Sequence, residues 1–247
     1  MPGLHMTLSP ELETAIDHVY AAFASEPPPT RLVASPLRDA ETILRTLTAA
    51  PLRQLADDQI EGYAAWAITT VGTARDYRHF LPRILDLAVH APFGLGQEPP
   101  VIAAKLKLAA WHDWPKEQRD AVLNLFETAL RAAVAASLDK LGALQGESWL
   151  CGLATLGCSP EPGLACWRAA PPPHAGFQIA HMAMVALAKN GTVSGGFWEE
   201  VDPVFRASVT AWLFDPATRD QLLAARALAP EDDQWELDVA LDRLGFA

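Results

Sequence analysis

The chain has 247 residues, of which 50% are hydrophobic and 20% are charged, and this apolar content supplies a full core and excludes a disordered protein. Its 19 Lys and Arg residues are outnumbered by 30 Asp and Glu residues, which gives a formal net charge of −11. Because the sequence contains no basic cluster that could bind a phosphate backbone, we expect no nucleic-acid partner.

In the N-terminal half, apolar residues recur at helical spacing between Pro- and Gly-rich breaks. Ser9 followed by Pro10 predicts the N-cap and first turn of a helix that ends before the prolines at 27–29. Ser35 and Pro36 predict a second start of the same kind. Further helices are expected at about 57–72, 80–90, 101–109 and from 115 to the middle of the chain.

Beyond Gly146 the predicted helices are at first shorter and more apolar. They are expected at about 149–156, 160–168, 177–189, 202–214, 216–228 and 231–244. Asn190-Gly191 is interpreted as a helix C-cap and exit, and Asp215-Pro216 as a capped start. The last helix is expected to carry its apolar residues at Trp235, Val239, Leu241 and Leu244.

No segment alternates apolar and polar residues as a half-buried strand does, and no hairpin turn joins two β-branched runs. The sequence therefore predicts an all-α fold of stacked antiparallel helix pairs, as in a HEAT-like α-solenoid, or an irregular helical bundle. No fixed sequence period is found, so any repeat is structural. We expect a single helical domain over residues 1–247, with a subdomain border near Gly146 as the alternative.

The sequence also bears on the compartment. The N-terminus lacks the basic and apolar regions of a secretory signal, and the longest charge-free stretch, residues 169–188, carries Pro and His residues that hydrocarbon does not accommodate. Cys151, Cys158 and Cys166 are an odd number in apolar surroundings and are expected to be reduced. These features predict a cytoplasmic protein without a membrane segment, and the use of Ala, Pro and Arg is typical of a GC-rich bacterial genome.

The most distinctive segment is TTVGTARDYRHFLPRILDL, residues 69–87. On a continuous helix Asp76, His79, Arg83 and Asp86 share one face, although Pro82 favours a kink or a fresh helix start. Arg83 is suited to an anionic group, and His79 with one of the carboxylates is suited to acid–base catalysis. The alternative is that Arg83 pairs with Asp76 or Asp86 and fixes a junction between helices.

Two further patterns in the sequence have a possible functional interpretation. Trp111 and Trp114 fall in a turn before Pro115, where two indoles form either an exposed binding anchor or a cap over the core. The Cys and His spacings after residue 157 lack the close ligand pair of a zinc site, and the Gly-rich loop at 191–196 lacks the Lys and the preceding strand of a phosphate loop. We therefore predict no metal site and no cofactor.

Residues 69–87 resemble a motif in a family of uncharacterised bacterial helical proteins, in which a Thr-Val-Gly turn precedes an Asp-aromatic-x-x-Phe-Leu-Pro-Arg core. The downstream AKLKLAAWHDWPKEQRDAV is similar to the family's Trp-x-x-Trp…Glu pattern, through Trp111, Trp114 and Glu117, with Leu106 also matching. The resemblance covers residues 63–122. It implies a helical fold and brings no activity with it.

The leading hypothesis is a helical scaffold that binds another protein, as an adaptor or as an immunity-type inhibitor of a basic partner, because such folds build extended surfaces. The predicted surface comprises Asp76, Tyr77, His79, Arg83, Asp86, Trp111 and Trp114. The alternative is a small-molecule enzyme in which Arg83 holds an anionic substrate and His79 acts as acid or base, which requires one pocket that contains both. The sequence leaves the oligomeric state open.

Overall fold

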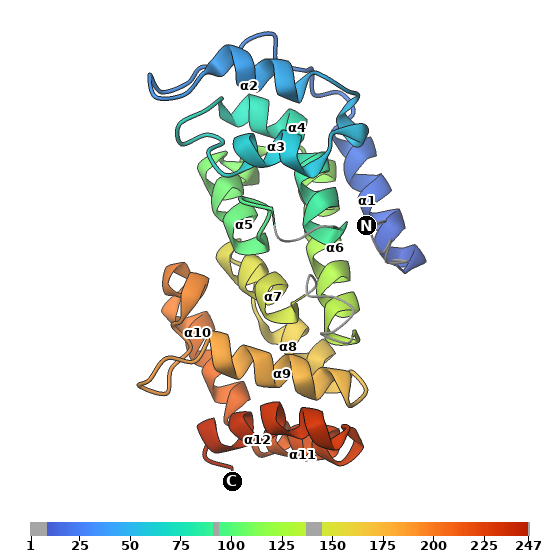
Figure 1. Ribbon diagram of the computed structural model, residues 1–247, viewed down its shortest axis with the longest axis vertical. Coiled ribbons are helices and arrows are strands. Elements are labelled where there is room, and N and C mark those ends of the chain that lie inside the picture. Colours follow the sequence, from blue (N-terminus) through green and yellow to red (C-terminus); the bar gives the residue numbers. More distant parts are fainter. Residues whose placement is uncertain (1–8, 91–93, 137–144, 247) are drawn as a thin grey trace. The chain divides into compact units, whose positions relative to one another are not determined.

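The computed structural model describes residues 9–90, 94–136 and 145–246 (Figure 1). Within these ranges the chain forms twelve α-helices, short 3-10 turns and three isolated backbone bridges, with no strand. The all-α prediction is therefore confirmed. The helix packing is compatible with both stacked pairs and an irregular bundle.

The chain divides into two compact units, residues 1–128 and 129–247. The division falls within the longest described helix, α6 (Lys116–Val134), which the sequence places near Pro115. The expectation of a single domain over residues 1–247, and its alternative of a subdomain border near Gly146, stay predictions beside this division.

The first unit is built around α4 (Ala74–His90), which packs against α1, α3, α5 and the 3-10 turn η1 (Leu52–Gln54). The other helices of this unit, besides the start of α6, are α1 (Pro10–Ala22), α2 (Ala40–Leu47), α3 (Asp57–Ala64) and α5 (Pro99–Leu108). Of the outcomes left open at Pro82, the fresh helix start is wrong, because Pro82 lies inside a continuous α4. The start is fixed earlier, where the Asp76 carboxylate accepts hydrogen bonds from the backbone and hydroxyl of Thr73.

The two predicted Ser-Pro starts have different outcomes. Ser9 caps α1 as expected, since its hydroxyl accepts a hydrogen bond from the backbone of the first turn. The start at Ser35 is wrong. Asp39 is the cap of α2, and its carboxylate accepts from the backbone N–H of Thr42 at 3.0 Å. The backbone N–H of Ser35 instead donates to the Thr70 carbonyl at 2.8 Å, which keeps this stretch in a loop.

The loop 33–38 and the loop 65–73 are joined through their backbones. The predicted helix 57–72 ends at Ala64, and its remainder turns back through Ile68 and Gly72, whose φ values are 68° and 69°. The N–H of Gly72 donates to the Val33 carbonyl at 2.7 Å, next to the bridge between Ala34 and Val71. The spacing of apolar residues predicted a helix across this stretch, but the left-handed backbone at Ile68 and Gly72 cannot be part of an α-helix.

The second unit centres on α9 (His174–Val185), which packs against α7, α11 and α12 (Figure 1). The close approach of α9 to α11 depends on Gly176, since a Cβ there would lie 2.2 Å from the Cβ of Ala225. The other helices are α7 (Gly146–Thr155), α8 (Glu161–Ala169), α10 (Pro203–Leu213), α11 (Pro216–Leu228) and α12 (Gln234–Arg243).

Two expectations for the second unit are wrong. Of the four apolar residues expected in the last helix, Leu241 and Leu244 are buried, but Trp235 and Val239 are 58% and 45% exposed, because α12 buries the face that carries Leu237 and Leu241. Asn190-Gly191 does not end a helix, since α9 already ends at Val185. It forms a turn between two residues that pair through a backbone bridge, Leu187 and Val193.

Candidate functional site

Asp86 is the centre of a buried polar network between α1 and α4. Its Oδ2 accepts hydrogen bonds from the Tyr20 hydroxyl at 2.8 Å and from the Arg83 guanidinium at 2.7 Å, and its Oδ1 lies 2.8 Å from Nδ1 of His90. Arg83 also donates through Nε to the Leu55 carbonyl at 2.8 Å. The side chains of Arg83 and Asp86 are only 16% and 7% exposed. Their pairing is the packing interpretation that the sequence left open.

The electrostatics of this network favour an ionised Asp86. Burial acts to raise the pKa of this carboxyl, but hydrogen bonds from His90, Tyr20 and Arg83 together hold the pKa below its usual value. The same Asp86 hydrogen bond raises the pKa of His90 against the opposing effect of burial. Burial first, and then the Asp86 charge, raises the pKa of Tyr20. The network therefore holds a charged carboxylate in place between two helices.

A second network joins the segment that follows α1 to α4 and α6. Arg78 forms an ion pair with Glu26 and donates to the Gln118 side-chain oxygen at 2.9 Å, and Gln118 in turn donates to Glu26 at 2.9 Å. Nδ1 of His79 lies 2.9 Å from the Glu26 backbone carbonyl. Sequence reasoning missed Arg78, Glu26 and Gln118, because their contacts span 40 residues or more and carry no local pattern.

The two networks bear on the enzyme hypothesis. That hypothesis requires one pocket containing His79 and Arg83. Among the described residues, His79 is bonded to the Glu26 carbonyl, whereas Arg83 is bonded to Asp86 and Leu55. Both side chains are therefore engaged in packing contacts, and the enzyme hypothesis gains no support from them.

Three other predicted residues belong to the core. Trp111 and Trp114 are each 7% exposed, and Trp114 packs edge-on against Phe23 with ring centroids 5.7 Å apart. Tyr77 is fully buried, burial raises its pKa, and its hydroxyl has no hydrogen-bond partner in the described part of the chain. The two indoles thus cap the core, which is the alternative to an exposed anchor.

Asp76 lies at the surface, in a pocket of about 430 Å³ between the loop after α1 and the start of α4. We call it the arginine pocket. Its lining residues are Pro27, Pro28, Pro29, Thr30, Arg31, Val33, Thr73, Arg75 and Asp76. Sequence reasoning missed both arginines, because the pocket forms only when two separate segments meet.

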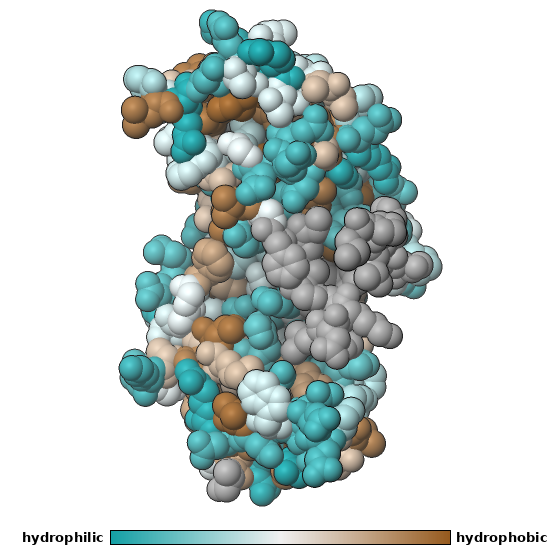
Figure 2. Space-filling model, viewed as in Figure 1, coloured by the Kyte–Doolittle hydropathy of each residue, from teal (hydrophilic) through white to brown (hydrophobic). Residues whose placement is uncertain are grey.

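An exposed apolar surface adjoins this pocket. Val33, Leu37 and Trp66 are 64%, 92% and 41% exposed, and we call these three residues the apolar patch. Their loops are joined by the bridge next to Val33, and the Arg38 guanidinium carbon lies 4.0 Å from the centroid of the Trp66 ring. In Figure 2, apolar side chains are exposed over the segment that precedes α2. No periodicity marks the patch in the sequence, because loops carry it.

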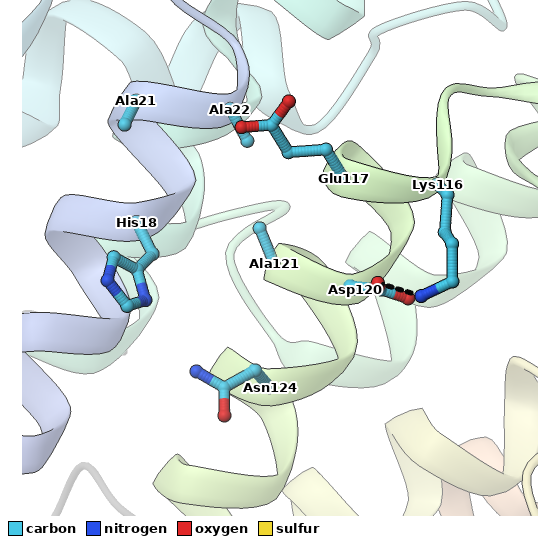
Figure 3. Close-up of a pocket in the computed structure, with 8 residues that line it drawn as sticks. All are labelled: His18, Ala21, Ala22, Lys116, Glu117, Asp120, Ala121 and Asn124. Atoms are coloured by element: carbon cyan, nitrogen blue, oxygen red, sulfur yellow. Dashed lines mark hydrogen bonds and ion pairs between the residues drawn. The ribbon is translucent and has the colours of Figure 1, made fainter.

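A groove of about 520 Å³ lies between α1 and α6 (Figure 3). Small side chains line both walls, from α1 and from α6, and Lys116 forms an ion pair with Asp120 at 2.5 Å. The lining comprises His18, Ala21, Ala22, Lys116, Glu117, Asp120, Ala121 and Asn124. Because its one lysine is neutralised on its own helix, the groove presents a weakly acidic surface.

In the second unit, Glu147 on α7 has a half-buried carboxyl. The indole Nε1 of Trp198 donates to Glu147 at 2.5 Å, and burial raises the Glu147 pKa. Burial, and then the Glu147 charge, raises the pKa of Cys151, which makes this thiol a poor nucleophile. None of the three cysteines, all of them in described residues, forms a disulfide. The described residues also contain no metal-binding group of His, Cys, Asp or Glu.

Exposed apolar side chains occur in the second unit as well, at Leu228 on α11 and at Trp235 and Val239 on α12. A third pocket, of about 420 Å³, lies between the 192–193 turn and α10 and includes Arg206. Of these surfaces, the apolar patch of the first unit alone adjoins a pocket with two unpaired cations, among the residues that the structure describes. It is therefore the candidate site.

Comparison of the chain with protein-family models, with curated proteins and with solved structures finds no match. In the described ranges, no helix combines the length and the apolar character needed to cross a membrane. The functional conclusion therefore depends on the geometry of the surface itself.

Proposed function

We propose that the protein is a protein–protein interaction module that docks its partner on the apolar patch of Val33, Leu37 and Trp66. The observation that carries this proposal is the exposure of these three large side chains on two loops that the backbone holds together. Contiguous exposed apolar surface is typical of binding sites, since its burial against a partner is favourable.

The patch is held in one conformation by contacts that are independent of a partner. The N–H groups of Ser35 and Gly72 are bonded to the opposite loop, and the Arg38 guanidinium is stacked on Trp66. A surface that is already ordered loses less conformational entropy on binding. An aromatic residue beside an arginine is also the composition in which binding energy is usually concentrated.

Site-specific photo-crosslinking tests this proposal. A photoreactive residue replaces Leu37 in the full chain, and the chain is expressed in cells that normally produce it. We expect one discrete adduct, and the protein identified in it should bind the purified chain. The Trp66→Ala variant should bind that protein at least tenfold more weakly.

Val204 on α10 provides the matched control, since it is 69% exposed and lies in the second unit. A photoreactive residue there should give no such adduct. If positions 37 and 204 give the same adducts, or if the purified partner binds Trp66→Ala as tightly as it binds the unmodified chain, the proposal is wrong.

A further inference from the structure

The arginine pocket contains two cations without a partner. Arg31 and Arg75 both line it and both are exposed, and neither forms an ion pair or a side-chain hydrogen bond within the described residues. By contrast, Arg78 and Arg83, in the same unit, are paired with carboxylates. An exposed guanidinium has five donors arranged as a planar fork, and here these donors are available to a ligand.

The one acidic side chain in the pocket is already engaged. Oδ2 of Asp76 accepts from the backbone N–H of Thr73 at 2.7 Å and from its hydroxyl at 2.9 Å, which makes it part of the start of α4. Two guanidinium groups against one carboxylate leave the pocket with a positive charge in a chain whose formal net charge is −11. Arg38, stacked on Trp66, adds a third cation to the apolar patch.

The pocket and the apolar patch are continuous, because Val33 belongs to both. An occupant that complements both must carry negative charge next to apolar side chains. A peptide segment with Asp or Glu beside large apolar residues has this combination, and its carboxylate matches the guanidinium fork. A nucleic-acid strand would leave Val33 and Leu37 without apolar partners, because its exposed surface is a charged sugar-phosphate backbone.

We propose that the site binds an acidic, apolar segment of a partner protein, with Arg31 and Arg75 holding a carboxylate while Val33, Leu37 and Trp66 receive apolar side chains. This inference names the chemistry of the partner and rests on the proposed docking function of the same patch. The proline run at 27–29 forms one wall of the pocket, and its fixed φ angles keep that wall in place without a ligand.

Selection from a random peptide-display library on the full-length chain tests the inference. We expect the enriched peptides to combine Asp or Glu with Leu, Ile, Phe or Trp. Fluorescence polarisation with the most enriched peptide should then show at least a tenfold weaker affinity for Arg31→Glu/Arg75→Glu. Both positions are exposed, so circular dichroism should show an unchanged fold, and Arg31→Gln/Arg75→Gln provides a milder version of the same test.

The matched control is Lys107→Glu/Arg219→Glu, which makes the same charge change at exposed cations outside the pocket and should leave the affinity unchanged. Enrichment of basic or uncharged peptides, absence of any enrichment, or equal affinity for the arginine variant would overturn the inference. So would competition by a single-stranded oligonucleotide at the same concentration as the peptide. If Leu37→Asp abolishes binding and the arginine variant does not, the docking function stands and only the inference fails. If neither variant affects binding, both fail.

Discussion

Replacing Asp86 with alanine is expected to destabilise the first unit strongly. The substitution removes the acceptor shared by Tyr20, Arg83 and His90 and leaves the 16%-exposed Arg83 without its carboxylate. Breaking a buried ion pair from one side costs about 3–5 kcal/mol, and the hydrogen bond from Tyr20 is not additive with it. We therefore expect the free energy of unfolding to fall by about 3–5 kcal/mol.

Urea unfolding followed by circular dichroism measures this change, and hydrogen exchange of the α1 and α4 amides localises it to the network. Asp120→Ala is the matched control. It breaks an ion pair whose side chains are 80% and 56% exposed, and it should cost about 0.3–0.5 kcal/mol. In Asp86→Leu/Arg83→Met, where neither charge remains buried, most of the lost stability should return. A loss below about 1 kcal/mol for Asp86→Ala would refute the reasoning.

The same network sets a pH window. The Asp86 pKa is lowered by folding, so its contribution to stability is present above the reference pKa of 3.8 and is lost as the pH falls through the folded value. The His90 pKa is raised, so its contribution is complete below the reference pKa of 6.5 and is lost as the pH rises through the folded value. Urea unfolding of His90→Gln should therefore lack the decline above pH 6.5 and keep the acid limb. An unchanged alkaline decline would contradict the assignment.

Three further predictions concern stability and are measured by urea unfolding. Gly176→Ala should destabilise the second unit by about 1–3 kcal/mol, because the new Cβ would overlap Ala225. Gly62→Ala should instead stabilise the chain by about 0.5–1 kcal/mol, because Gly62 lies on α3 and no atom lies within 4 Å of the new Cβ. Equal effects would show that the packing of α9 on α11 is looser than described. Ser9→Ala should lower the free energy of unfolding by about 1 kcal/mol, because it removes a helix cap. Ser35→Ala should lower it by less than half of that, because Ser35 caps no helix. A larger loss for Ser35→Ala than for Ser9→Ala would support the helix start at Ser35. Because folding raises the pKa of Glu147, its contribution to stability is complete below the reference pKa of 4.5 and is lost as the pH rises through the folded value. Glu147→Gln should flatten this decline, and its amide oxygen still accepts the hydrogen bond from Trp198. A decline that persists in Glu147→Gln would assign it to another group.

Local signals predicted the helices well. The repeat of apolar residues and the Ser9-Pro10 start placed α1, and Asp215-Pro216 placed the start of α11, where Asp215 accepts a hydrogen bond from the Ala217 N–H at 2.7 Å. These features depend on residues within four positions of one another, which a sequence displays directly. The all-helical class followed from the same signals.

Errors arose where contacts between distant segments override local preference. Ser35 has the residue type and the following proline of a helix start, but the carbonyl of Thr70 binds its N–H and fixes a loop. Trp235 has inward spacing, but α12 buries another face against α9 and α11 and leaves this indole 58% exposed. Thr70 lies 35 residues from Ser35, and α9 is separated from α12 by the whole of α10 and α11, so no local pattern records these partners.

The candidate site shows the same division between local and distant information. Periodicity placed Asp76, Arg83 and Asp86 on one helical face and left open whether Arg83 pairs internally. In the structure Arg83 pairs internally with Asp86. The Tyr20 hydroxyl, from the distant α1, donates a further hydrogen bond to the Asp86 carboxylate. The sequence could not reveal Arg31 or Trp66, because each acquires its role from a loop that another loop positions.

The distinctive segment at 69–87 is nevertheless connected with the proposed surface. Its last part forms α4, anchored to α1 through Asp86, and its first part forms the turn from Thr69 to Thr73. That turn ends in the Thr73–Asp76 cap and holds the opposite loop through the N–H of Gly72. A change that detaches Asp86 should therefore loosen α4 without exposing new charge in the arginine pocket. A change at Gly72, where φ is 69° and a Cβ would lie 3.2 Å from Tyr63, should instead release the loop that carries Val33 and Leu37. On this reasoning the segment determines the position of the binding surface and supplies Arg75 to it, whereas the other residues that contact the partner come from elsewhere in the chain.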